Sequence, residues 1–220
     1  MSPTVPPSRL SRRSCRAVLG AGALALLAAC SVLPKPKPQD VYLLPAGATA
    51  EPAAATPLPW SLRVLRPSAS PMLAGSRILV LPQDNQVSYY QGASWHEPAP
   101  TLLRHRLLDA LRADGRIAQL SDDERLLQAD FELDSELRAF QSEYHAGAPE
   151  AVIRLDVRLV RTGSQRIVAS RRFEVRRTAT ATAVGAVVQA FGLAADGLAV
   201  ELGRWTVEQM ATATPHPAQR

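Results

Sequence analysis

The sequence predicts an α+β domain in two layers, a mostly antiparallel sheet covered by two amphipathic helices. Three observations support this fold class. Apolar residues alternate with polar ones in several consecutive runs, which is the pattern of strands with one buried face. Two other segments carry apolar residues at helical spacing. The apolar fraction, 46% of 220 residues, is enough for one ordinary core.

The first strands are predicted in the N-terminal half of the chain. The short segment Val41–Leu44 and the alternating run Trp60–Arg66 each predict one strand. The compact apolar run Arg77–Leu81 is typical of a buried strand. Gln86–Tyr90 is its expected hairpin partner, across a turn at Pro82–Asn85.

The period then changes to that of a helix. Residues 101–114 predict the first helix, because leucines recur there at helical spacing, two prolines precede it and Gly115 suits its end. The acidic segment Ser121–Glu124 predicts a second, short helical turn, with Ser121 as its N-cap and carboxylates in its first turn.

Alternation returns after residue 130. Three more strands are predicted around Phe131–Leu137, Ile153–Leu159 and Ile167–Val175, and Thr162–Gln165 predicts a hairpin turn between the last two. Residues 184–209 predict a long C-terminal helix. Charged residues interrupt its apolar pattern, so we interpret it as amphipathic and not as a membrane span.

The positive charge of the chain is concentrated at its start. The formal net charge is +5, from 25 basic and 20 acidic residues. Residues 1–29 contain four arginines and no acidic residue, which leaves 21 basic and 20 acidic residues, a net charge of +1, for the rest. A nearly neutral domain lacks the broad basic surface that nucleic acid requires, so we expect no nucleic-acid partner.

Residues 1–29 have the parts of a signal peptide. Arginines precede the apolar segment Ala17–Leu27, which is too short to span about 30 Å of hydrocarbon. The closing residues Leu27–Cys30 resemble a lipobox, the signature of bacterial lipoproteins. The resemblance implies cleavage before Cys30 and lipidation of its thiol, with acyl chains such as palmitate. The alternative is an ordinary signal peptide with a chance cysteine. Arg12-Arg13 leaves twin-arginine export open beside general secretion, which we favour.

Residues 30–40 are predicted to comprise the lipidated cysteine and a tether that follows it. Three prolines alternate there with lysines and favour an extended polyproline II path. The only other cysteine, Cys15, leaves with the signal peptide, so the mature chain has neither a free thiol nor a disulfide. Ser31 stands where an aspartate would resemble an inner-membrane retention signal. We therefore expect the periplasmic side of the outer membrane.

The sequence contains no pattern that indicates catalysis, a metal or a cofactor. The four histidines are not spaced in the sequence as pairs of metal ligands are. They are His96, His105, His145 and His216. Ser94 is near His96, but no G-x-S-x-G turn surrounds the serine. The arginines of the later strands favour a solvated strand face, with an anionic partner surface as the alternative. They stand at positions 154, 158, 161, 166, 171, 172, 176 and 177.

A block of residues in the middle of the chain resembles a known family. The run Tyr89-Tyr90-Gln91-Gly92-Ala93-Ser94-Trp95 leads through two prolines into Leu102-Leu103 and Arg106-Leu107. This block resembles the ABC-type transport auxiliary lipoproteins, which include the paraquat-inducible PqiC type. The lipobox agrees, as do segments in the expected order at Tyr42–Leu44, Leu62–Val64, Ile78–Val80, Asp130–Leu133, Phe140 and Val168–Arg171.

The resemblance implies a domain at residues 41–212, followed by a disordered tail at 213–220. It also implies partnership with an Mce-domain protein and an ABC-type or related inner-membrane machine. Such systems move lipids or other hydrophobic molecules between two membranes. We therefore expect a non-enzymatic, outer-membrane-anchored component of a trans-envelope transport system. The alternatives are a lipid-anchored envelope enzyme and an unrelated envelope-maintenance lipoprotein.

The candidate partner contacts are Tyr89, Tyr90 and Trp95, because large amphipathic rings are enriched where interfaces gain most of their binding energy. The alternative is that these rings pack the helix onto the sheet. Extended strand edges offer one route to self-association, and we expect a homo-oligomer.

Overall fold

The fold is organised around one long strand, β7 (Phe131–His145). Along one edge β7 pairs antiparallel with β8 (Ala148–Arg161), and β8 pairs antiparallel with β9 (Arg166–Thr178). The computed structural model describes residues 39–45, 56–125 and 127–213. The expected signal peptide, Cys30, the tether up to residue 38 and the tail from residue 214 lie outside the described residues.

Three short strands share the other edge of β7, and all three run parallel to it. They are β2 (Ser61–Val64), β3 (Ser68–Ala69) and β4 (Arg77–Gln83). Further out lie β6 (Gln119–Asp122) on β2, β5 (Gln86–Trp95) on β4 and β1 (Asp40–Tyr42) on β5. The sheet is mostly antiparallel, as predicted, because its long ladders β4–β5, β7–β8 and β8–β9 are antiparallel.

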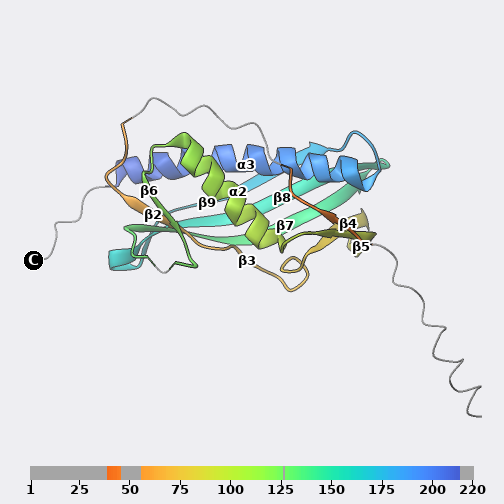
Figure 1. Cartoon of the computed structure of the whole chain (residues 1–220), viewed down its shortest axis with the longest axis horizontal. Helices are drawn as coiled ribbons and strands as arrows, with labels where there is room; N and C mark the ends of the chain where they lie inside the picture. Colours follow the sequence, from red (N-terminus) through yellow and green to blue (C-terminus); the bar gives the residue numbers. More distant parts are fainter. Residues whose placement is uncertain (1–38, 46–55, 126, 214–220) are drawn as a thin grey trace, which may run out of the picture. The chain divides into compact units, whose positions relative to one another are not determined.

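In the described part of the chain, helices α2 (Ala99–Asp114) and α3 (Val184–Thr212) form the second layer (Figure 1). The predicted end of α2 is confirmed. Gly115 adopts a left-handed conformation with φ 75°, and its N–H donates to the carbonyl of Leu111. Glycine is the residue that adopts this conformation at least cost, so the chain can turn away directly after the helix. The predicted two-layer α+β fold is therefore confirmed.

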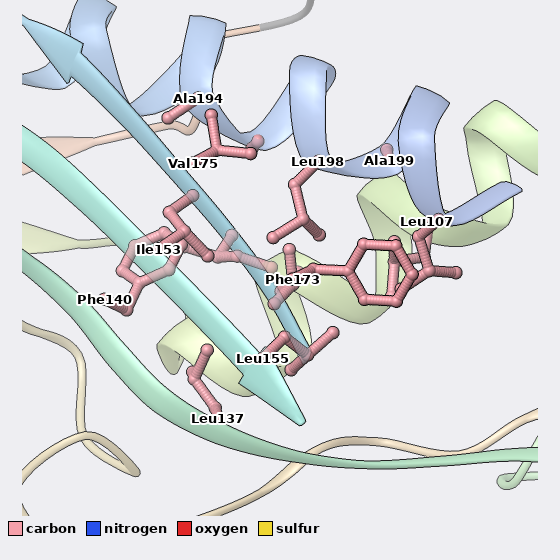
Figure 2. Packing of buried hydrophobic residues seen from close by; sticks show 14 of the residues in the cluster. Leu107, Leu137, Phe140, Ile153, Leu155, Phe173, Val175, Ala194, Leu198 and Ala199 are labelled. Carbon is pink, nitrogen blue, oxygen red and sulfur yellow. The ribbon is translucent and has the colours of Figure 1, made fainter. Parts of the chain in front are cut away.

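The inner face of the sheet and the two helices enclose one hydrophobic core. Ile153 and Leu155 of β8 and Phe173 of β9 point toward α3, where Leu198 and Ala194 meet them (Figure 2). All five side chains are fully buried or nearly so. This burial is the main source of stability available to the domain, because the described residues contain no cysteine.

Helix α3 is long and apolar enough, by length and composition alone, to cross a membrane. Half of its most apolar stretch is buried inside the fold, however, because the helix packs along β8 and β9. Its exposed side carries Arg204 and Glu208. In this fold α3 therefore covers the sheet and does not stand apart from it as a membrane-spanning helix would.

The helical turn predicted at Ser121–Glu124 is wrong. Ser121 and Asp122 belong to β6, and the two acidic residues that follow bind an arginine of α2. Arg104 is only 2% exposed, and its guanidinium donates to Asp123 Oδ1 and Glu124 Oε1, each at 2.5 Å. The buried guanidinium of Arg104 needs these two carboxylates as hydrogen-bond acceptors. Asp123 and Glu124 therefore lie against α2 and do not begin a helix of their own.

Burying an acid under α3 tests the packing of this helix. Leu202 is fully buried, so Leu202→Asp places a carboxylate in the core. It should lower the free energy of unfolding by roughly 3 kcal/mol or more, and the melting temperature by roughly 6–12 °C. The control is Val200→Asp on the same helix, because Val200 is 48% exposed. Equal melting temperatures for the two variants would show that α3 does not cover the sheet through Leu202.

Removing the buried guanidinium tests the contact between α2 and the loop after β6. Arg104→Ala should lower the free energy of unfolding by about 2 kcal/mol, because it removes charge-assisted hydrogen bonds to Asp123 and Glu124 and the packing of a buried side chain. Arg112→Ala, which removes an exposed partner of Asp109 on the same helix, should change it by less than about 1 kcal/mol. Chemical denaturation of both variants measures the difference, and equal values would contradict the contact.

The Arg104 contact also has a pH signature. Partial burial raises the pKa of Asp123, but hydrogen bonds, above all from Arg104, outweigh it and lower this pKa below its usual range. A lowered pKa contributes stability above about pH 4 that is lost as the pH falls further. The cost of Arg104→Ala should therefore shrink in acid, and a cost that grows there would contradict this contact.

Candidate functional site

The aromatic block that carries the family resemblance lies in β5, between β4 and β1. The register on β4 shifts here, because Leu79 pairs with Tyr89 while Arg77 pairs with Ser94. The strand therefore bulges between Tyr89 and Ser94. Gly92 has φ 71° within the bulge, a backbone conformation that favours glycine. Gly92 thus lies in a bulge inside a continuous strand.

Trp95 lies in the core and not on the surface. It is 2% exposed, and its ring meets Phe140 edge-on at 5.7 Å and Phe191 edge-on at 5.3 Å between ring centroids. Phe140 and Phe191 stack on each other at 4.9 Å. Trp95 therefore packs the sheet against α3, and its ring is not available to a partner in this fold. Of the two interpretations, core packing is the one that the structure gives for this residue.

The two tyrosines occupy intermediate positions. The Tyr90 hydroxyl donates to Ser142 Oγ at 3.1 Å, and burial raises the pKa of Tyr90 above its usual range. The guanidinium of Arg77 lies over the ring of Tyr89, 3.8 Å from its centroid. Both rings are half-buried, so each keeps part of its surface in solvent. Partner contact remains a hypothesis for Tyr89 and Tyr90 alone.

The outer face of β7, β8 and β9 carries a ladder of ion pairs. Arg158 pairs with Asp134, and Arg154 with Glu174, both at 2.7 Å. Further pairs join Arg138 and Arg172 to Asp156, and Arg176 to Glu143, Glu150 and Glu174. These cations are paired within the sheet, which for Arg154, Arg158, Arg172 and Arg176 favours the solvated strand face over an anionic partner surface. The eight predicted arginines do not share one face, however, because Arg171 pairs with Glu201 of α3 and Arg161 lies over the rings of Trp60 and Phe131.

The arginines of this ladder lower the pKa values of two of its carboxyl groups. The hydrogen bond from Arg172 lowers the pKa of Asp156 to about 2, and the hydrogen bond from Arg154 lowers the pKa of Glu174 to about 2. A hollow of about 380 Å³ on this face is lined by charges of both signs, including Glu136, Arg138 and Asp156. Such a lining does not suit a hydrophobic molecule.

The histidines of the described residues do not form a metal site. His96 and His105 lie 3.5 Å and 3.4 Å from the same Glu97 carboxylate, and His145 lies beside Glu143 and Glu150. Within the described ranges, no group of three or more His, Cys, Asp or Glu side chains could hold a metal ion. His216 lies outside them. Ser94 is buried in β5.

Sequence reasoning missed the arginine that joins three parts of the fold. Arg106 of α2 forms an ion pair with Asp196 of α3 and also donates to the carbonyls of Leu44 and Pro45, after β1. Arg106 is part of the block that resembles the family. Its place in the predicted helix does not indicate these partners, however, because they are distant in the sequence. Its contacts fix the segment after β1 against both helices.

Comparison with known proteins agrees with this fold. A model of the family described as "ABC-type transport auxiliary lipoprotein component" matches residues 42–203. No curated protein sequence matches the chain. Protein XCC0632 from Xanthomonas campestris, of the DUF330 family, is 32% identical with a TM-score of 0.71, over 77% of this chain and 95% of that chain. A second solved structure, of an uncharacterised protein, is 17% identical with a TM-score of 0.61, over 77% of this chain and 99% of that chain, and shows the fold alone.

The family match covers β2 to β9, α2 and most of α3, including the bulged strand β5 and Arg106. The relative from Xanthomonas campestris is similar in both sequence and fold. The family resemblance first seen in the aromatic block is therefore confirmed, and the chain belongs to the ABC-type transport auxiliary lipoprotein family.

Proposed function

We propose that this chain is a lipid-anchored periplasmic component of a trans-envelope transport system, and that it acts by position and contact instead of catalysis. The observation that carries the proposal is the match of residues 42–203 to a family of transport auxiliary lipoproteins. The lipobox-like residues Leu27–Cys30 support it independently, since they stand before the matched domain where an anchor is needed.

In this proposal the anchor is lipid on Cys30, and the membrane is the outer membrane. A chain with more than one acyl group stays bound, since each buried CH₂ contributes about 0.8 kcal/mol. Ser31 supports outer-membrane sorting because it is not an aspartate. The domain then lies on the periplasmic side of that membrane.

The proposed partner is an Mce-domain protein of the transport complex. The ion-pair ladder is a poor interface, because docking there would desolvate many charges that are already paired. The β4–β5 hairpin offers a less charged surface, with Val87 43% exposed and Tyr89 half-buried. Confinement to the membrane raises the effective concentration of the domain, so a modest interface suffices.

We also propose that the protein self-associates. Within the described residues β9 pairs with β8 alone, which leaves its other edge open. An open edge of 13 residues can pair with a second chain. Copies arranged in this way would present several hairpins to one partner.

The anchor can be tested directly in cells. Cys30→Ser should abolish incorporation of labelled palmitate and leave the protein uncleaved or soluble, because no acyl acceptor remains at the cleavage site. Cys15→Ser, within the expected signal peptide, is the matched control and should still be labelled. Palmitate on the Cys30→Ser protein would contradict the lipobox assignment.

The partner can be tested by crosslinking in cells, with a photoreactive residue at Val87 or Tyr89. Either position should capture an Mce-domain protein. A photoreactive residue at Leu127, which is 54% exposed in the loop before β7, is the control and should not. If a scan of the surface captures no Mce-domain protein while palmitate labelling is intact, the partner assignment is wrong.

A further inference from the structure

The chain enters the described fold close to its expected anchor. Nine residues, 31–39, separate Cys30 from the first strand. At the polyproline II rise of about 3.1 Å per residue they reach roughly 28 Å. Strand β1 is therefore confined near the bilayer, whereas more distant parts of the domain can turn away from it.

Strand β1 and the residue that follows it each present one apolar side chain to solvent. Val41 is 62% exposed and Leu43 is 66% exposed, whereas the alternate residues Tyr42 and Leu44 pack against the core. Side chains of a strand alternate between its two sides, so Asp40 falls on the side opposite to Val41 and Leu43. The outward side of this segment is apolar.

Helix α3 adds a third apolar residue at the same corner. Leu193 is 61% exposed and follows Gly192, over which Pro45 lies. A methyl group at Gly192 would come within 3.0 Å of Pro45 Cβ, so the glycine permits this close approach. Arg106 holds the segment there through the Leu44 and Pro45 carbonyls.

Two of the charges at this corner compensate each other. Arg106 forms an ion pair with Asp196, one helical turn from Leu193. If an apolar surface covers this corner, each of these two charges therefore keeps its partner as it loses contact with water. Exposed apolar side chains next to a lipid tether have the chemistry of a segment that lies in the membrane interface.

We propose that Val41, Leu43 and Leu193 form a membrane-contacting corner, which seats on the surface of the bilayer that holds the lipid anchor. The proposal rests on the anchor at Cys30 proposed above. The contact fixes the orientation of the domain, so that β9, at the opposite edge of the sheet, points away from the membrane. Four strands lie between β1 and β9, which at about 4.8 Å per strand spacing separates them by roughly 24 Å.

The test uses the full chain, lipidated in cells and reconstituted into vesicles of phosphatidylethanolamine and phosphatidylglycerol. Leu43→Cys and Leu193→Cys each receive an environment-sensitive fluorophore, and Cys30 does not react because its thiol is acylated. Ile167→Cys on β9 is the matched control, since Ile167 is 58% exposed. Emission at the two corner positions should shift to the blue, with severalfold stronger quenching by nitroxide-labelled lipid than at the control.

Equal quenching at the three positions, in protein that carries labelled palmitate, would overturn the corner and leave the anchor intact. A blue shift at Leu43→Cys without quenching by lipid would also overturn it, because a second copy or another protein would then cover the corner. Loss of palmitate labelling in the wild-type chain would instead contradict the proposed anchor. In a Leu193→Glu background, quenching at Leu43→Cys should fall toward the control value, and unchanged quenching would contradict the contribution of Leu193.

Discussion

The packing of α3 on the inner face of β8 and β9 is the interaction on which the rest of the structure depends. The sheet buries alternate side chains of its long strands, and without α3 these would face water. No disulfide supports the described residues, because none of them is a cysteine. The apolar core, to which Phe173, Leu198 and Leu202 belong, must therefore supply most of the stability.

This packing leaves the two faces of the sheet with different properties. The inner face is buried in the core. Trp95 is buried there, although it belongs to the most recognisable part of the sequence. The outer face carries paired charges across the three long strands. Besides the solvent side of the helices, the rim of the molecule is left for contact, and the β4–β5 hairpin, the edge of β9 and the corner at Leu43 lie there. A component that works by position would use these edges.

The long elements were predictable because their patterns are local. Alternation gave β7, β8 and β9, and the helical period with Gly115 gave α2 and its end. The parallel pairing of β2, β3 and β4 on β7 was not predictable, since a local pattern indicates a strand but not its partner, and β3 has only two residues. Asp123 and Glu124 look like helix-start residues, yet their partner Arg104 is far away in sequence. The burial of Trp95 likewise depends on Phe140 and Phe191, which no local pattern connects to it.

On the membrane, α3 and the sheet should form one cooperative unit, although α3 has the length and composition of a membrane span. Native-state hydrogen exchange on the full, lipidated protein in vesicles tests this directly. Amides of α3 around Leu198 and of β8 around Ile153 should exchange with the same free energy, that of global unfolding. Exchange of α3 at a much lower free energy, with β8 still protected, would mean that the helix leaves the sheet and would contradict the account.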